Sequence, residues 1–287
     1  MRLATLILPG RGEIPAAISP DGSTFRELGG PGRPGLSDFV EDLPAPPGDA
    51  GDPHPIVAAR FAPVLPRPNA VWCVGLNYED HRRETGRERA AFPTLFTRFA
   101  SSLVGHGEPM IRPMLSRKLD YEGELAVVIG KPGRHIPAAE ALDHVAGYAC
   151  FNDGSVRDFQ GHSSQFAAGK NFFRTGAFGP WLVTSDEIPD PQNLSVETRV
   201  NGKVRQRGHT SQMTWPIREL IAYLSGITPL GPGDVLVTGT PSGVGVARTP
   251  PVFLEPGDLV EVEIEGLGVL YNRIRGEEEE AEEEDEE

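Results

Sequence analysis

The sequence predicts a strand-rich α+β protein with a small N-terminal domain and a larger second domain. Its 287 residues include 34 glycines and 28 prolines, a composition that favours many turns and short strands over long helices. The apolar segments are mostly short runs bounded by glycine, proline or charged residues, as expected for strands. A chain of this length can bury a full core and suggests one large domain, or one together with a small one.

The N-terminal part divides into a strand-like segment and a linker. Residues 1–27 alternate short apolar runs with turn residues, which predicts a few strands. Residues 29–55 are rich in proline and glycine and have the composition of a loop or linker. A short apolar piece then leads to Pro66-Arg67-Pro68, so we expect a small domain over residues 1–65 and the main domain over residues 66–275.

The net charge of −14 comes largely from an acidic tail at residues 276–287. Ten acidic groups lie in residues 277–287, so the remainder of the chain carries only −4. Such a like-charged block is expected to be disordered. Neither the tail nor the body has the basic footprint that nucleic-acid binding requires.

Two further observations concern location and cysteine chemistry. No apolar run is long enough to cross a membrane, and the N-terminus lacks the long apolar region of a signal peptide. We therefore expect a cytoplasmic protein. Cys73 and Cys150 stand in no CxxC or zinc-spaced cluster, so they are expected to be buried thiols.

The stretch at residues 71–99 begins as a buried strand, residues 71–76. It opens into a charged segment, residues 77–88, which predicts a short helix or a mobile loop. On a helix, His81 and Glu84 would share a face, either as a functional pair or as part of a solvated helix. Strand character returns at residues 92–99, where the single cation Arg98 is expected at the surface.

Residues 120–130 combine paired carboxylates with an apolar run. Glu122 and Glu124, together with Asp120, should project from one face of a strand, and their charges repel unless water or a cation screens them. The run Leu125–Ile129 predicts the buried half of the same strand. The pattern fits a solvated strand end or one wall of a metal site, and spacing does not separate these alternatives.

The following segment adds another acid, a cation and an amide. Residues 136–145 suggest a short helix, and residues 147–151 predict a buried strand. Asp153, Arg157 and Gln160 come next, spaced so that they would share one face of a helix beginning there. Helix capping together with a solvated face would explain the same pattern.

The C-terminal half contains mainly structural signals. Asn201-Gly202 between apolar runs predicts a β-hairpin. Residues 216–226 predict a helix that begins at proline, ends at glycine and carries one apolar face. Residues 234–238 predict a buried strand leading into a glycine-rich loop, residues 239–245, which lacks the lysine of a nucleotide P-loop. Residues 260–264 alternate between apolar and acidic side chains, as in a half-exposed strand.

Several enzyme classes lack their signature in this chain. No Gly-x-Ser-x-Gly elbow, Rossmann glycine pattern or His-Glu-x-x-His motif is present. Carboxylates remain at strand ends, together with Lys170 and Arg157, and a His-Glu pair. Oxygen ligands of this kind prefer Mg²⁺, Mn²⁺ or Ca²⁺ to Zn²⁺.

These motifs occur in an order that resembles the fumarylacetoacetate hydrolase family. The blocks that carry the resemblance are Gly75-Leu-Asn-Tyr-x-x-His81-x-x-Glu84, Leu119-Asp-Tyr-Glu-x-Glu124-Leu-Ala-Val-Val-Ile-Gly130, Asn152-Asp-x-Ser-x-Arg157-Asp-x-Gln160, Gly169-Lys170-x-Phe172, Gly179-Pro-Trp181, Val200-Asn-Gly202 and Thr238-Gly-Thr-Pro-x-Gly-Val-Gly245. The resemblance covers about residues 70–272. It implies a mixed β-sheet roll of the family's C-terminal type, a small N-terminal domain and a homodimer.

The resemblance also implies roles for individual residues. Glu122, Glu124 and Asp153 match the metal carboxylates. His81 and Glu84 match a catalytic pair on a lid over the substrate. Lys170 matches the residue that polarises a substrate oxygen. The positions that match substrate contacts are Arg157, Gln160, Thr240, Asn77 and Tyr78.

Three departures leave the exact substrate open. Residues 75–78 offer no additional carboxylate before the lid, so water is expected in its place. Gly123 stands where many relatives carry a bulkier residue, and Arg98 stands where many carry lysine. The resemblance is to the group that contains acylpyruvases and 2-hydroxyhepta-2,4-diene-1,7-dioate isomerases.

The expected activity is that of an Mg²⁺- or Mn²⁺-dependent hydrolase, with Ca²⁺ as a further option. It would cleave a C–C bond in acylpyruvate- or fumarylpyruvate-type 2-oxo acids through an enolate that the cation and Lys170 stabilise. This chemistry belongs to the breakdown of aromatic compounds. Three alternatives stay open: decarboxylation of oxaloacetate-like acids, keto–enol isomerisation of hydroxymuconate-type diacids, and a non-catalytic metal-binding homologue.

Overall fold

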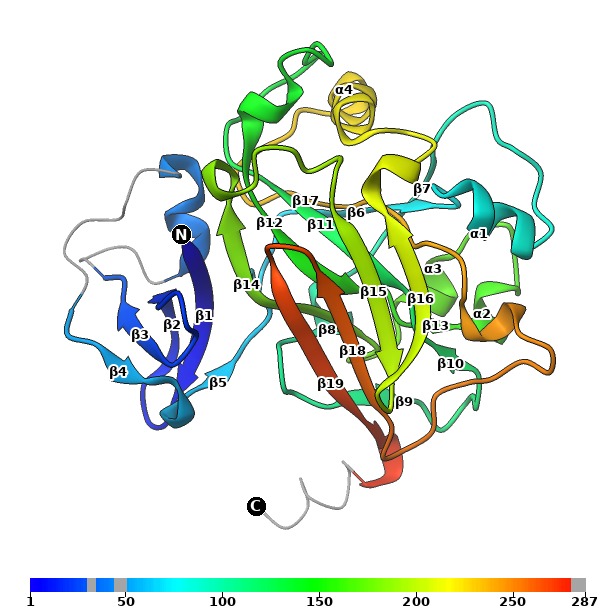
Figure 1. Cartoon of the computed structure of the whole chain (residues 1–287), viewed down its shortest axis with the longest axis horizontal. Helices are drawn as coiled ribbons and strands as arrows, with labels where there is room; N and C mark the ends of the chain where they lie inside the picture. The colour runs from blue at the N-terminus through cyan, green and yellow to red at the C-terminus, as the bar shows by residue number, and fades with distance from the viewer. Residues whose placement is uncertain (30–34, 44–50, 280–287) are drawn as a thin grey trace.

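The computed structural model describes residues 1–29, 35–43 and 51–279. It contains two large β-sheets, and its short helices α1, α2 and α3 gather on the side away from the N-terminal strands (Figure 1). The predicted strand-rich α+β class is therefore confirmed. Within the described ranges, no helix has the length and apolar character needed to span a membrane.

The larger sheet contains twelve strands within the described residues. These are β1 (Arg2–Leu8), β2 (Gly12–Ile18), β3 (Thr24–Glu27), β4 (His54–Pro55), β5 (Arg60–Phe61), β6 (Val71–Gly75), β7 (Thr94–Thr97), β8 (Leu103–Val104), β11 (Gly123–Ile129), β12 (Val145–Asn152), β14 (Gly176–Thr184) and β17 (Val235–Val237). The main order is β4-β3-β2-β1-β14-β12-β11-β17-β6-β7. β17 pairs parallel with β6 and antiparallel with β11, which confirms the expected mixed sheet.

The second sheet has the order β16-β15-β18-β19-β9. Its strands are β9 (Met110–Arg112), β15 (Ser195–Val200), β16 (Lys203–His209), β18 (Leu259–Ile264) and β19 (Gly268–Gly276). Asn201 and Gly202 connect β15 to β16 with φ values of 51° and 71°, so the predicted hairpin is confirmed. A separate pair joins β10 (Leu119–Asp120) to β13 (Ser155–Val156).

The helices are short except for one. They are α1 (Glu79–Glu84), α2 (Arg157–Gln160), α3 (Ala167–Lys170) and α4 (Ile217–Ile227), with 3₁₀ turns η1 (Leu36–Asp38), η2 (Val40–Asp42), η3 (Ile56–Ala58), η4 (Ala100–Ser102), η5 (Ala141–His144), η6 (Ser185–Glu187), η7 (Thr210–Gln212) and η8 (Gly245–Ala247). α4 confirms the predicted amphipathic helix, although it continues one residue past Gly226. The helix expected over residues 136–145 is reduced to η5, because the backbone N–H groups of His135 and Ile136 donate to Ser225 on α4.

β11 lies between two parts of the core. Leu125 and Val127 belong to one apolar cluster, together with Val262 and Leu270 of the second sheet. Ala126 belongs to another cluster, with residues of the N-terminal segment and of β14. The apolar run is continuous because both faces of this strand are covered.

The N-terminal segment joins the main sheet directly, through the antiparallel pairing of β1 with β14. In the described part of the predicted linker, Leu36, Phe39 and Val40 are buried. The division between residues 65 and 66 remains a prediction. Disorder is expected for residues 276–287. Of these, Gly276 is the last residue of β19 and Glu277 accepts a hydrogen bond from Met114 N, whereas residues 280–287 lie outside the described residues.

Candidate active site

Three carboxylates meet where β11 and β12 run side by side. Glu122 directly precedes β11, Glu124 is its second residue, and Asp153 directly follows β12. The antiparallel register pairs Gly123 with Asn152, which brings the two strand ends together. One oxygen from each carboxylate lies within 4.8 Å of the others, and all three side chains are buried.

Lys170 reaches this cluster from the end of α3. Its Nζ lies 2.5 Å from Glu122 Oε2 and 2.5 Å from Asp153 Oδ2. Burial by itself would lower the pKa of Lys170, but the charges of Asp153 and Glu122 outweigh it and raise the pKa. Lys170 is therefore a permanently protonated donor at physiological pH.

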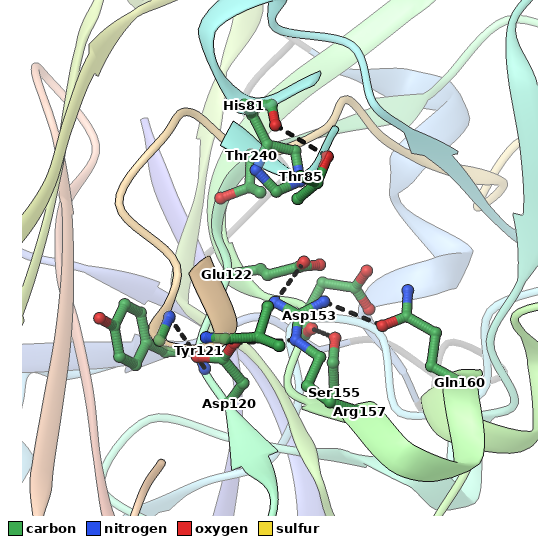
Figure 2. A network of polar contacts seen from close by, with 12 residues as sticks. His81, Thr85, Asp120, Tyr121, Glu122, Asp153, Ser155, Arg157, Gln160 and Thr240 are labelled. Carbon is green, nitrogen blue, oxygen red and sulfur yellow. Dashed lines mark hydrogen bonds and ion pairs between the residues drawn. The ribbon is translucent and has the colours of Figure 1, made fainter. Parts of the chain in front are cut away.

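Arg157, the first residue of α2, contacts the cluster from another direction. Its guanidinium contacts Glu122 Oε1 at 2.7 Å and donates to Asp120 Oδ2 at 2.8 Å and Gln160 Oε1 at 2.9 Å (Figure 2). Burial raises the pKa of Glu122, but Arg157 and Lys170 more than offset this effect and hold the pKa below its usual range. Glu122 therefore keeps its negative charge within the cluster.

Asp120 links this side of the site to the glycine-rich loop. The carboxylate is fully buried and accepts hydrogen bonds from the backbone N–H groups of Gly245 and Val246. It also contacts Arg157. Asp120 therefore positions Arg157 and the loop.

We predicted one helix face that carries Asp153, Arg157 and Gln160. This prediction is wrong for Asp153. Only Arg157 and Gln160 lie on α2, because the intervening Ser155 and Val156 pair with β10. Asp153 still faces the same site, since its carboxylate contacts Lys170.

Arg98 was expected at the surface, and that prediction is wrong. The residue is 3% exposed, and its Nη1 donates to Asp153 Oδ1 at 2.6 Å and to Gly154 O at 2.9 Å. Its Nη2 donates to Ser102 O and to Thr175 Oγ1. A lone cation within an apolar run was the only sequence feature that could have indicated burial of Arg98. Sequence alone does not distinguish a buried, paired cation from a solvated one.

The charges and donors of the cluster fit a divalent cation. Glu124 is buried, its carboxylate accepts from Gly239 N, and burial together with Asp153 and Glu122 raises its pKa. Four described carboxylates, Asp120, Glu122, Glu124 and Asp153, face three cations, Arg98, Arg157 and Lys170. Ionisation of all four would leave one negative charge in excess, which a bound divalent cation would compensate. Uncompensated buried charge is costly, and an oxygen-only donor set suits Mg²⁺ or Mn²⁺.

The charged segment at residues 77–88, predicted as a short helix or a mobile loop, contains the helix α1. His81 and Glu84 share a face of this helix, and His81 Nδ1 lies 2.8 Å from Glu84 Oε1. Gly243 N donates to both oxygens of Glu84, at 3.1 and 2.9 Å, so the helix is tied to the glycine-rich loop. With Nδ1 engaged by a carboxylate, Nε2 is the nitrogen of His81 available to a ligand.

One cavity of about 310 Å³ collects most of the predicted site residues. Those that line it are His81, Glu84, Glu122, Glu124, Asp153, Arg157, Gln160, Lys170 and Thr240. His81 and Glu122 approach this space from opposite sides (Figure 2). Thr240 Oγ1 is also bonded within the protein, donating to Gly123 O and accepting from Gln206.

Asn77 and Tyr78 are not brought to this cavity. The amide of Asn77 is used structurally, because it donates to Thr238 O and Trp215 O and accepts from Trp215 N. Tyr78 is buried and lines a separate cleft with Glu79. We therefore do not propose either residue as a substrate contact.

Comparison with known proteins places the fold and site in a family. The sequence model of the family "Fumarylacetoacetate (FAA) hydrolase C-terminal" matches residues 70–275 of this chain. The chain belongs to this family. The human protein oxaloacetate tautomerase FAHD2A, mitochondrial, is 48% identical over 216 residues, which cover 75% of this chain and 68% of the relative.

Solved structures with the same architecture are named for different activities. 5-Carboxymethyl-2-hydroxymuconate delta-isomerase from Mycobacterium smegmatis is 32% identical with a TM-score of 0.80, and the match covers 96% of this chain and 100% of the other. Fumarylacetoacetate hydrolase from Exiguobacterium antarcticum is 34% identical with a TM-score of 0.82, again covering 96% and 100%. The predicted family and fold are confirmed, whereas hydrolysis as the activity is not.

Proposed function

We propose that this protein is a divalent-metal-dependent tautomerase of 2-oxo diacids of the oxaloacetate type. Such an enzyme moves a proton between C3 and the 2-oxo oxygen. The observation that carries the proposal is the placement of His81, oriented by Glu84, across one cavity from the carboxylate cluster. A proton acceptor then faces the place where a cation would hold the 2-oxo acid. The 48% identity to an oxaloacetate tautomerase supports this choice.

Glu122, Glu124 and Asp153 would hold Mg²⁺ or Mn²⁺. When bound, the ion supplies positive charge that favours the enolate form of a 2-oxo acid. Lys170 supports the same charge. Two of its three ammonium hydrogens are directed to Glu122 and Asp153, which leaves one donor for a substrate oxygen.

His81 is the proposed base. Glu84 accepts a hydrogen bond from Nδ1–H, which leaves the lone pair of Nε2 to take a proton from C3 and deliver it to the 2-oxo oxygen, or to carry it in the reverse direction. Gln160 accepts from Arg157 through Oε1, so its NH₂ group remains to orient the substrate. The bond from Gly243 N to Glu84 holds the helix that carries the base.

Hydrolysis is the second candidate. The same His81–Glu84 pair would suit removal of a proton from water, and the hydrolase from Exiguobacterium antarcticum has the same fold at lower identity than the tautomerase. Decarboxylation of oxaloacetate shares the enolate. A non-catalytic homologue would have no need for an oriented base facing the cavity.

The test compares reactions in one protein preparation with Mg²⁺ or Mn²⁺. We expect the enol form of oxaloacetate to be converted to the keto form faster than acetylpyruvate is cleaved, both followed by ultraviolet absorbance. The His81→Ala variant should lose about 10²–10⁴-fold in turnover, the usual contribution of a general base, and should retain Mn²⁺ binding by calorimetry.

Three other results would change the assignment. Preferential cleavage of acetylpyruvate would favour the hydrolase, and pyruvate release from oxaloacetate would favour the decarboxylase. Metal binding without any turnover would favour the non-catalytic homologue. The homodimer and the cytoplasmic location remain predictions, and light scattering after size exclusion tests the first.

A further inference from the structure

Arg87 presents a positive charge to the cavity that no described residue neutralises. The residue lines the cavity and is exposed to solvent. Arg157 and Lys170 line it too, but the Arg157 side chain is only 8% exposed, Lys170 is buried, and both are directed to carboxylates. Within the described residues, the guanidinium of Arg87 has neither a hydrogen bond nor an ion pair. Arg87 is thus the cation of this cavity that is available to a ligand.

The backbone of Arg87 is held by the motif that ends α1. Gly86 has a φ of 67°, Gly86 N donates to Arg83 O at 3.1 Å, and Arg87 N donates to Arg82 O at 3.2 Å. These two bonds form a Schellman motif, which fixes the chain just after a helix. The side chain of Arg82 also donates to the carbonyl of Arg87. The position of Arg87 is therefore set relative to the helix that carries His81.

The nearest acid in the chain that also lines the cavity does not compete for Arg87. Glu84 is three residues earlier, but its oxygens accept from Gly243 N and contact His81. The other cavity-lining carboxylates belong to the buried cluster around Lys170. An incoming carboxylate is the natural partner for the remaining exposed guanidinium.

The cavity therefore has two differently charged regions. Its buried part holds the acidic cluster, where the 2-oxo acid group would be held, and its solvent-exposed edge carries Arg87. The distal end of a bound 2-oxo acid would extend from the first region toward the second. A second carboxylate on that end would meet Arg87, whereas a methyl group would leave Arg87 solvated.

We propose that Arg87 is the specificity-determining residue that makes the site prefer 2-oxo diacids to 2-oxo monoacids. This inference rests on the proposed function and assigns recognition of the distal carboxylate to the end of the lid helix. The base and the acidic cluster would act on both kinds of acid, because neither contacts the distal group.

The experiment compares oxaloacetate with 2-oxobutanoate, which has the same four-carbon chain but no second carboxylate. Enzyme-dependent exchange of the C3 protons in D₂O is followed by NMR for the wild type, Arg87→Gln, Arg87→Lys and Arg89→Gln. Arg89 is the matched control, since it lies in the same segment but lines a different cleft. Calorimetry with Mg²⁺ measures binding of the unreactive pair D-malate and 2-hydroxybutanoate.

For Arg87→Gln we expect kcat/KM for oxaloacetate to fall about five- to tenfold, as for loss of a partly exposed charge-assisted contact. The value for 2-oxobutanoate should stay within about twofold, as should both values for Arg89→Gln. Arg87→Lys should recover part of the diacid preference, because it keeps the charge without the planar fork.

Equal losses for both acids, or no loss for oxaloacetate, would overturn the assignment of Arg87. If the wild type exchanges neither acid, the proposed function fails while the calorimetric pair still decides the inference. Tighter binding of D-malate than of 2-hydroxybutanoate, lost in Arg87→Gln, would support it. No preference for D-malate in the wild type would refute it.

Discussion

Replacing Arg98 with methionine should weaken both the fold and the metal site. Arg98 makes five hydrogen bonds, to Asp153 Oδ1, Gly154 O, Thr175 Oγ1 and both the hydroxyl and carbonyl oxygens of Ser102. Methionine fills similar space but leaves these acceptors without their donor. Breaking a buried ion pair from one side costs about 3–5 kcal/mol, because the remaining charge is uncompensated.

The effect on metal binding follows from the contact with Asp153. Arg98 holds Oδ1, while Oδ2 contacts Lys170 Nζ beside the other carboxylates. Loss of a group that orients a ligand lowers metal affinity about 10–100-fold. Arg98→Lys keeps the charge but has fewer donors, so we expect a cost of about 1–3 kcal/mol in the free energy of unfolding.

Urea unfolding followed by circular dichroism measures the first effect, and calorimetry with Mn²⁺ measures the second. The control is Arg67→Met, since Arg67 pairs with Glu13 at 2.7 Å but is 75% exposed. A surface pair of this kind contributes at most about 1 kcal/mol. The argument is refuted if Arg98→Met costs no more than Arg67→Met, or if the folded variant binds Mn²⁺ as tightly as the wild type.

Three further predictions concern single positions. Glu124→Gln should abolish Mn²⁺ binding in calorimetry without lowering metal-free stability, because glutamine keeps the acceptor for Gly239 N and removes a charge that burial and neighbouring acids disfavour by raising the pKa of Glu124. A variant that still binds Mn²⁺ normally would exclude Glu124 as a ligand. Burial lowers the pKa of His106 from 6.5 to about 4, so the unfolded chain binds a proton at this residue first as pH falls, and stability is lost between these pH values. The free energy of unfolding should therefore fall by about 2 kcal/mol near pH 5. Urea unfolding at about pH 8 and pH 5 should show a smaller fall for His106→Asn than for the wild type. Gly123→Ala would place Cβ 2.1 Å from Thr198 Oγ1 and should cost about 1–3 kcal/mol; Thr198→Ala should recover part of that stability in a double-mutant cycle, and additive effects would contradict the clash.

Local patterns predicted several elements because their causes are local. The Asn201-Gly202 hairpin forms since both residues adopt the positive φ that its turn requires. α4 forms behind Pro216 because its apolar side chains recur on one face. The His81–Glu84 pair was foreseeable because three-residue spacing on a helix places two side chains together.

Where the same kind of reasoning was wrong, contacts between distant parts of the chain determined the structure. The segment after Asp153 begins as a strand because Ser155 pairs with Asp120, a partner distant in the chain. Arg98 is buried because Asp153 and Thr175 supply acceptors for it. Asn77 is used within the fold because it meets Thr238 and Trp215.

By itself, the sequence determined the strand-rich class, the family resemblance and the residue types available for a metal-dependent reaction on a 2-oxo acid. It left the pair Glu122 and Glu124 ambiguous, since Glu261 and Glu263 have the same spacing. Only the tertiary structure distinguishes them: β11 and β12 bury the first pair beside Asp153, whereas Glu261 and Glu263 stay at the surface with Arg199. The physical reason is that desolvation and the proximity of other charges depend on packing between distant segments, which spacing along one strand does not encode.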